Sequence, residues 1–312
     1  MWREINGFLM WLKYGVDKNG ALVGIEDVPK GKTPLQCPYC NGSLTAKKGK
    51  IKEHHFAHTE ETCRAVAATN KEIPVLPLYE NFNLQLSGKE FDRLQLLWRE
   101  YGSKNQIIIR ELIVTSFLYR ELLQEKPGFN PPVYEFTKLG KIPFGGLPLV
   151  HFNQVQEPLL LKKLSDLEEK TERAQLINLS NLPELLVDLR IYRTQLKRIF
   201  STTLYYLKIQ VDGKILHKIG VTQRSVDERI EEIKSDLKKY FQTVNIEVLG
   251  SWLHRGNVEK YFKHRYQKFN YPIGSLTEYY NFNTEDANIV LRDLQQMKPK
   301  VLSQVELDIL QT

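Results

Sequence analysis

Four residues in the last third of the chain have side chains that could together cut a phosphodiester bond. Tyr205 supplies a phenol, Arg229 a cation, and Glu259 a carboxylate able to bind a divalent metal ion. Phosphodiester hydrolysis needs groups that orient and activate water, neutralise phosphate charge and hold a metal. The fourth, Lys218, has an ammonium that would lower the pKa of the phenol if the two were close. Taken singly, each residue has an ordinary structural explanation, so the prediction depends on the elements that carry them.

The residues around Tyr205 predict a β-hairpin. Tyr205, Leu207 and Ile209 alternate with Tyr206 and Lys208, and a second strand is predicted over 215–219. Asp212-Gly213 lies between these runs and is typical of a hairpin turn. Tyr205 and Lys218 should therefore lie on adjacent strands.

Two helices and a third strand are predicted to follow this hairpin. Ser225 opens a capping-box pattern, so a helix that bears Arg229 should begin there. Residues 243–250 alternate again and predict a strand. Asn257 is a candidate cap for a second helix, which bears Glu259.

The predicted helix that bears Glu259 is also rich in basic residues. Four of them are candidates for DNA contact: Lys263, His264, Arg265 and Lys268. Aromatic residues lie between them, and this mixture suits contacts with phosphates and with bases or sugars. His264 is also a candidate proton relay. A plain amphipathic helix with a charged outer face explains part of the same pattern.

Residues 201–283 resemble the GIY-YIG nuclease family. Tyr205 matches the tyrosine of the first half-motif of that family, and Ile219-Gly220 match the end of the second half-motif. Arg229 matches the family arginine, and Glu259 matches the metal-binding glutamate. The resemblance implies an endonuclease that uses Mg²⁺ or Mn²⁺, in phage defence, restriction or a mobile element.

The sequence departs from that family pattern at two positions. Thr203 stands in place of the first glycine, and Lys218 stands in place of the second tyrosine. The Lys-Ile-Gly variant and the later Thr277-Glu278-Tyr279-Tyr280-Asn281-Phe282 are similar to a phage-type branch of the family. The lost tyrosine leaves open which group deprotonates the water, and His217 is a second candidate base.

All three cysteines of the chain lie in one short window near its beginning. Cys37 and Cys40 have the spacing of a zinc knuckle, and His58 and Cys63 have a normal spacing for a second ligand pair. These four ligands would complete a structural zinc site, and His55 is the alternative to His58. Reduced thiols without a metal are the alternative interpretation.

Residues 8–66 resemble the amino-terminal zinc module of CoiA-like competence proteins. The resemblance rests on Cys37-Pro38-Tyr39-Cys40, followed by His55-Phe56-Ala57-His58 and Cys63. It implies that the protein handles DNA. Leu44, Ile51 and Phe56 predict a small hairpin that carries the ligands.

The middle of the chain gives weaker signals. Helical spacing occurs over 90–101, the apolar run 107–123 predicts one or two helices, and 133–140 predicts a strand. This order is similar to a winged helix-turn-helix, and a helical scaffold is an equal alternative. A single C-terminal helix is predicted over 285–310.

The chain of 312 residues is therefore predicted to be an α+β protein of several domains. The carboxy-terminal domain should contain a small mixed or antiparallel sheet. The expected parts are a zinc module at 1–72, a helical or winged-helix domain at 73–150, a helical linker at 151–200, the nuclease domain at 201–285 and a C-terminal helix at 286–312.

The composition bounds the function without identifying it. A net charge of +7 fits a polyanionic partner, which we expect to be DNA and which could also be RNA. No apolar run is long enough to span a membrane, and a cytoplasmic protein is expected. A homodimer or a larger complex is compatible with the leucine-bearing segment over 159–189. The alternatives to a nuclease are a non-catalytic DNA-binding subunit and an interaction scaffold.

Overall fold

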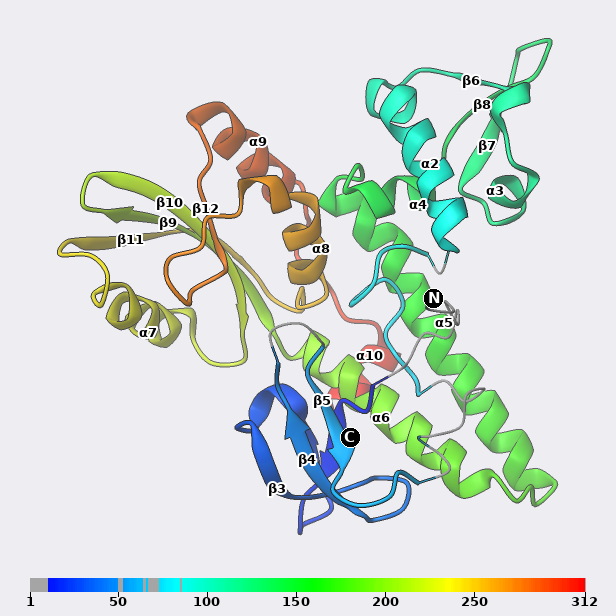
Figure 1. Ribbon diagram of the computed structural model, residues 1–312, viewed down its shortest axis with the longest axis vertical. Coiled ribbons are helices and arrows are strands. Elements are labelled where there is room, and N and C mark those ends of the chain that lie inside the picture. Colours follow the sequence, from blue (N-terminus) through cyan, green and yellow to red (C-terminus); the bar gives the residue numbers. More distant parts are fainter. Residues whose placement is uncertain (1–10, 50–52, 64–65, 67–72, 85, 312) are drawn as a thin grey trace, which may run out of the picture. The chain divides into compact units, whose positions relative to one another are not determined.

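The structure, a computed structural model, describes residues 11–49, 53–63, 66, 73–84 and 86–311 (Figure 1). The chain divides into two compact units, of which the first contains residues 1–76 and 160–196 and the second residues 77–159 and 197–312. Helices and three antiparallel sheets make up the described part, which confirms a mixed α/β class. None of the described helices is long and apolar enough to cross a membrane.

The first unit contains a five-stranded antiparallel sheet with the strand order β2-β1-β3-β4-β5. Its strands are β1 (Tyr14–Val16), β2 (Leu22–Gly24), β3 (Gly31–Gln36), β4 (Ser43–Lys47) and β5 (His55–His58). The pairing of β4 with β5 confirms the predicted hairpin, and Leu44 and Phe56 are buried in its core. Ile51, which the prediction also included, lies outside the described residues.

Two long helices occupy the range predicted to be a linker. They are α5 (Leu149–Leu176) and α6 (Leu182–Phe200), and residues 160–196 of them belong to the first unit. In that unit Tyr39 donates a hydrogen bond of 2.6 Å to Asp188 on α6. Tyr192 on α6 donates one of 2.8 Å to the carbonyl of Leu160 on α5. The structure thus divides the chain differently from the linear series of domains that the sequence predicts.

The segment before α5 combines short helices with a three-stranded sheet of order β6-β8-β7. Its elements are α2 (Gly88–Glu100), β6 (Ile108–Ile109), α3 (Thr115–Tyr119), β7 (Leu123–Lys126), β8 (Val133–Phe136) and α4 (Lys138–Lys141). The prediction of helices across 107–123 is wrong for most of that range, where only α3 is α-helical. In a short run of apolar residues, the hydrophobic periodicity does not distinguish a buried strand from a buried helix.

A four-stranded antiparallel sheet of order β11-β9-β10-β12 forms the centre of the carboxy-terminal region. Its strands are β9 (Thr203–Val211), β10 (Lys214–Thr222), β11 (Val244–Trp252) and β12 (Tyr279–Tyr280). The pairing of β9 with β10 around Asp212-Gly213 confirms the predicted hairpin.

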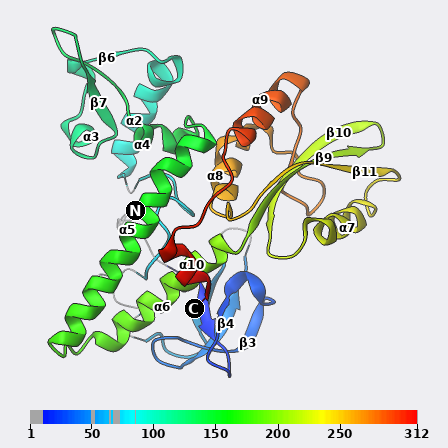
Figure 2. The same ribbon diagram turned by 180° about the vertical axis from the view of Figure 1, so that it is seen from behind.

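Helices cover both faces of this sheet (Figure 2). On one face, Ile233 and Leu237 of α7 (Val226–Leu237) pack against Leu207 of β9. On the other face, Phe262 of α8 (Val258–Arg265) shares a core with Tyr206. Helix α9 (Thr284–Gln295) adds Val290 and Leu294 to that second core. Side chains on the two faces of β9 therefore pack into two different hydrophobic cores.

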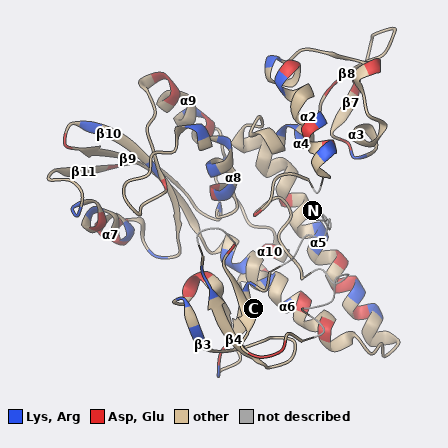
Figure 3. Ribbon diagram, in the orientation of Figure 1, with Lys and Arg blue, Asp and Glu red and all other residues tan. Residues whose placement is uncertain are grey.

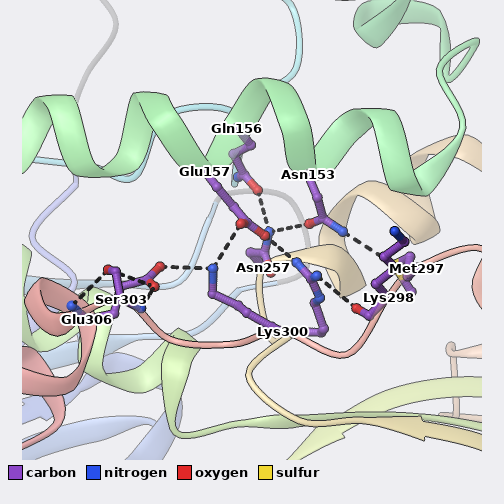
Figure 4. A network of polar contacts seen from close by, with 10 residues as sticks. Asn153, Gln156, Glu157, Asn257, Met297, Lys298, Lys300, Ser303 and Glu306 are labelled. Atoms are coloured by element: carbon purple, nitrogen blue, oxygen red, sulfur yellow. Dashed lines mark hydrogen bonds and ion pairs between the residues drawn. The ribbon is translucent and has the colours of Figure 1, made fainter.

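The C-terminal region forms two helices, so the prediction of one helix over 285–310 is wrong. Helix α9 ends at Gln295, and α10 (Gln304–Gln311) begins after a connecting segment that contains Pro299. Proline lacks the N–H group that a continuous helix would need at that position. Within the second unit, Lys300 of this segment contacts Glu157 and Glu306 (Figure 4).

Candidate functional site

The phenol of Tyr205 lies directly against the backbone of Gly220. The two residues are opposite each other in the pairing of β9 with β10, and Tyr205 is almost completely buried. A Cβ atom at position 220 would lie 2.3 Å from the Tyr205 Oη atom. This position therefore requires glycine, because any side chain would overlap the phenol.

Arg229 lies in the first turns of α7 and reaches the same phenol. The helix begins at Ser225, whose hydroxyl accepts a hydrogen bond from the Glu228 backbone, as the sequence predicts. Arg229 Nε donates to Tyr205 Oη over 3.4 Å, and Arg229 Nη1 donates to Glu232 Oε2 over 2.6 Å. The guanidinium is thus held between a phenol and a carboxylate.

The pKa of Tyr205 is raised above its ordinary value. Burial is the largest cause, and the carboxylates of Glu259 and Glu278 add to it, while Arg229 acts in the opposite direction. The phenol is therefore protonated at neutral pH. The prediction that Lys218 lowers this pKa is not supported, because the opposing cation is Arg229.

Lys218 instead belongs to a chain of ion pairs that ends at Glu259. Lys218 Nζ lies 3.0 Å from Glu278 Oε2, and Glu278 also accepts a hydrogen bond from Lys263. Lys263 Nζ lies 3.1 Å from Glu259 Oε1. Glu278 reaches Lys218 because the next residue, Tyr279, pairs with Lys218 between β12 and β10.

The charges in this chain shift one another's pKa values. Burial lowers the pKa of Lys218, which is only 4% exposed, although Glu278 acts against this. Burial would raise the pKa of Glu278, but Lys218 and Lys263 together lower it to about 2. Burial would lower the pKa of Lys263, yet Glu259 and Glu278 raise it. At neutral pH Glu278 is therefore an anion.

The structure thus brings together all four residues predicted to be catalytic. Tyr205, Lys218, Arg229 and Glu259 come from β9, β10, α7 and α8. Two carboxylate groups, those of Glu259 and Glu278, meet at the ammonium of Lys263. Oxygen ligands of this kind suit Mg²⁺ or Mn²⁺, which are usually bound by one or two carboxylates together with water and substrate phosphate.

His217 lies on the opposite face of the sheet from Tyr205 and Lys218. It is buried against Tyr206 and Phe282, with ring centroids 5.6 Å and 5.5 Å away. Burial lowers its pKa to about 4. Within the described part of the chain its Nδ1 atom has no hydrogen-bond partner. The prediction of His217 as a second base is therefore not supported.

Lys and Arg are frequent on α8 (Figure 3), and the basic side chains of α8 and of the turn after it differ in what they contact. His264 stacks on Phe82 and contacts the backbone carbonyls of Ile142 and Pro143. Arg265 pairs with Asp293 at 3.0 Å. Lys263 is held by two glutamates, and only Lys268 of the four is exposed. The prediction that His264 and Arg265 contact DNA is not supported, because both side chains contact the protein itself.

Asn257 is at the start of α8, but its side chain does not cap that helix. Its Nδ2 atom instead donates to Asn153 at 2.8 Å and Gln156 at 3.0 Å (Figure 4). The amide therefore joins α8 to the beginning of α5 within the second unit.

Sequence reasoning gave no role to Glu278 or Glu232. Each carboxylate bridges two cations, Lys218 and Lys263 for the former and Arg224 and Arg229 for the latter. The sequence signal for Glu278 is its place beside the aromatic pair of β12. For Glu232 the signal is its i,i+3 spacing from Arg229 on the predicted helix, whereas its contact with Arg224 is visible only in the folded protein.

The predicted zinc ligands meet at one point of the first unit. One ligand atom from each of Cys37, Cys40, His58 and Cys63 lies within 4.8 Å of the others. Tetrahedral zinc with ligands at about 2–2.3 Å holds them a little closer together, so the cluster fits a structural zinc ion. His55, the alternative ligand, instead contacts the carbonyl of Glu53 at 2.8 Å.

The thiol of Cys37 is fully buried, and burial raises its pKa. Backbone hydrogen bonds from Tyr39 and Cys40 lower this pKa, while the charges of Cys63 and Cys40 raise it further. A buried thiolate such as that of Cys37 is costly without a compensating charge. A divalent ion would supply that charge, which agrees with the geometry.

Two segments of the chain match known domain families. Residues 25–66 match the N-terminal domain of the competence protein CoiA, within the range that the sequence predicts. No curated protein and no solved structure matches the chain. Residues 202–295 match the T5orf172 domain, which is nuclease-like and suggests a nuclease or DNA-binding role; the GIY-YIG family itself is not shown.

Proposed function

We propose that the second unit is a divalent-metal-dependent DNA endonuclease of the GIY-YIG type. The single observation that carries this proposal is that Tyr205 contacts Arg229 and also lies near enough to Glu259 for that carboxylate to shift its pKa. These residues are distant in sequence, and their groups are those that phosphodiester hydrolysis requires. The match of residues 202–295 to a nuclease-like domain supports the same reaction class.

In this proposal Tyr205 orients the attacking water and does not remove its proton. Its raised pKa keeps the phenol protonated at neutral pH, so it can donate one hydrogen bond while accepting another from Arg229. Arg229 faces the phosphate and neutralises the charge that develops there. Lys218 and Glu278 act as positioning residues, because their contacts fix the charges around the phenol.

Glu259 would hold Mg²⁺ or Mn²⁺, and Glu278 is the second carboxylate within reach of the same ammonium. A bound divalent ion would polarise the phosphate and lower the pKa of nearby water. The ammonium of Lys263 would then be displaced towards Glu278, which is also its partner. The zinc module would have a structural role in handling DNA, in a defence, restriction or mobile-element context.

One observation favours the alternative, a DNA-binding protein without catalysis. Lys263 Nζ is 3.1 Å from Glu259 Oε1, so an ammonium already neutralises the carboxylate proposed to bind the metal. Such a pair would be stable without any ion. A DNA-binding subunit or scaffold would then use the same surface without cutting.

The test is incubation of the full chain with supercoiled plasmid in Mg²⁺, Mn²⁺ or EDTA. We expect metal-dependent cleavage, with nicked circles before linear DNA because one site cuts one strand at a time. Glu259→Gln should abolish it, and Arg229→Ala should slow it by on the order of a hundredfold.

Glu231→Gln is the matched control, because Glu231 is exposed on α7 and pairs only with neighbouring Lys234 in the described contacts. Equal cleavage by wild type and Glu259→Gln would contradict the site. DNA binding without cleavage in any metal would favour the alternative.

A further inference from the structure

An open hollow lies beside the candidate active site and is lined by three arginines. It has a volume of about 380 Å³, and Arg198, Arg224 and Arg229 reach it. Thr202, Thr222 and Gln223 supply polar side chains, and none of the described lining residues is acidic. Arg229 belongs to the proposed site, since it donates to Tyr205, so the hollow continues from the place where the phosphate would be cut.

The arginines come from three different elements of the second unit. Arg198 lies on the last turns of α6, Arg224 on the turn after β10, and Arg229 on α7. Arg224 and Arg229 share a single carboxylate, that of Glu232, so a positive charge remains between them. An anionic ligand in the hollow would offset that charge.

The turn that carries Arg224 is held in place by side chains. Thr222 Oγ1 accepts a hydrogen bond of 3.0 Å from the Arg224 backbone N–H and lies 3.3 Å from the Arg224 carbonyl. Gln223 Nε2 donates to Ser201 at 2.9 Å, which ties the turn to the end of α6. These hydrogen bonds fix the backbone from which the Arg224 side chain extends.

Glu232 holds two of the three arginines on the side of α7. It lies 2.7 Å from Arg224 Nη2 and 2.6 Å from Arg229 Nη1, and these contacts lower its pKa. One carboxylate facing two guanidinium groups leaves positive charge in excess. A phosphate in the hollow would compete with Glu232 for the same donors.

We propose that this hollow binds a DNA phosphate. The phosphate is the one that neighbours the cleaved phosphate on the same strand. The inference rests on the proposed function for its orientation, and it adds Arg198 and Arg224 as DNA-binding residues. Arginine forms paired hydrogen bonds with phosphate oxygens, which fixes the position of the strand as well as its affinity. Binding there would place the next phosphate beside Arg229, which contacts Tyr205.

The test measures binding of a fluorescein-labelled DNA duplex to the full chain by anisotropy, in EDTA and from 50 to 200 mM KCl. Arg198→Ala and Arg224→Ala should each weaken binding roughly 3- to 10-fold and reduce the slope of log K against log salt by about 0.9. Arg224→Lys should keep that slope. Arg292→Ala is the matched control, an exposed arginine on α9 of the same unit, and should change neither quantity.

Glu232→Gln provides a test with the opposite sign. It removes the anion that competes with phosphate, so it should tighten DNA binding severalfold. If Glu232 only maintained the structure, its loss would weaken DNA binding. Slopes for Arg198→Ala and Arg224→Ala equal to that of Arg292→Ala would overturn the inference, even if the plasmid is cut. Reduced slopes without any metal-dependent cleavage would leave the phosphate site standing and remove the proposed endonuclease.

Discussion

At the scale of single residues, a glycine sets the position of the candidate catalytic phenol. Gly220→Ala would place a Cβ atom 2.3 Å from Tyr205 Oη and force the ring away from Arg229. We expect loss of cleavage and a lower free energy of unfolding by roughly 1–3 kcal/mol, as overpacking of a buried site usually costs. Plasmid cleavage and urea denaturation measure the two effects.

Gly88→Ala is the control for that substitution. A Cβ atom there would meet nothing within 4 Å, and the residue begins α2 in the same unit. It should leave both quantities unchanged. Full activity of Gly220→Ala would mean that the phenol need not occupy its position in this structure.

Glu278 predicts a dependence of stability on pH at the same scale. Its pKa is about 2 in the folded protein and near 4.5 without its partners. Stability from this carboxylate is therefore present above pH 4.5 and is lost as the pH falls towards 2. The difference in unfolding free energy between wild type and Glu278→Gln should shrink over that range. Glu247→Gln, an exposed glutamate on β11, should show no such trend. A difference that stays constant with pH would argue against the ion pairs of Glu278.

At the scale of elements, local patterns in the sequence predicted the hairpin well. The alternation around Tyr205 and the turn at Asp212-Gly213 correspond to β9 and β10 to within a few residues. The start of α7 at Ser225 was equally clear, because a cap is a local feature. The Cys/His cluster was predictable for the same reason, since knuckle spacing places two thiols on one turn.

Contacts between distant elements could not be predicted in this way. Lys218 and Glu278 are brought together by the pairing of β10 with β12, which no local pattern encodes. His264 and Arg265 have the composition of a DNA-binding face, yet their partners come from distant segments that pack on α8. Arg198 joins the hollow only because α6 ends beside the turn after β10. In each case tertiary packing decides which way a charged side chain points.

The zinc element yields a prediction that separates two histidines. His58→Ala removes a ligand from the four-residue cluster, so it should release zinc and destabilise the sheet of the first unit. His55→Ala should retain the metal, because His55 packs against Trp11 and contacts the carbonyl of Glu53 instead. Elemental analysis of the two purified variants measures this. If His58→Ala retained zinc and His55→Ala lost it, His55 and not His58 would be the zinc ligand.

At the scale of the whole molecule, the tail of the chain is tied into the second unit. Lys300 Nζ lies 2.9 Å from both Glu157 at the start of α5 and Glu306 on α10 (Figure 4). Arg255, which precedes α8, also pairs with Glu157. Burial would raise the pKa of Glu306, but Ser303 and Lys300 lower it, so the carboxylate is ionised. Four charged groups from distant segments thus join α5, α8 and α10.

Lys300→Met should loosen this connection. Its side chain is 6% exposed, and its loss leaves two glutamates facing each other with only Arg255 as a counter-charge. We expect the second unit to lose roughly 2–4 kcal/mol of stability, as removal of one partner from a buried ion pair does. Lys298→Met, two residues earlier and exposed, should change it by less than about 0.5 kcal/mol. Hydrogen exchange of peptides over 297–306 localises the effect, and equal exchange in the two variants would show that Lys300 does not hold the tail. If the connection does hold, Lys300→Met should also lower the temperature at which DNA cleavage is lost, because Arg255 leads into the helix that carries Glu259.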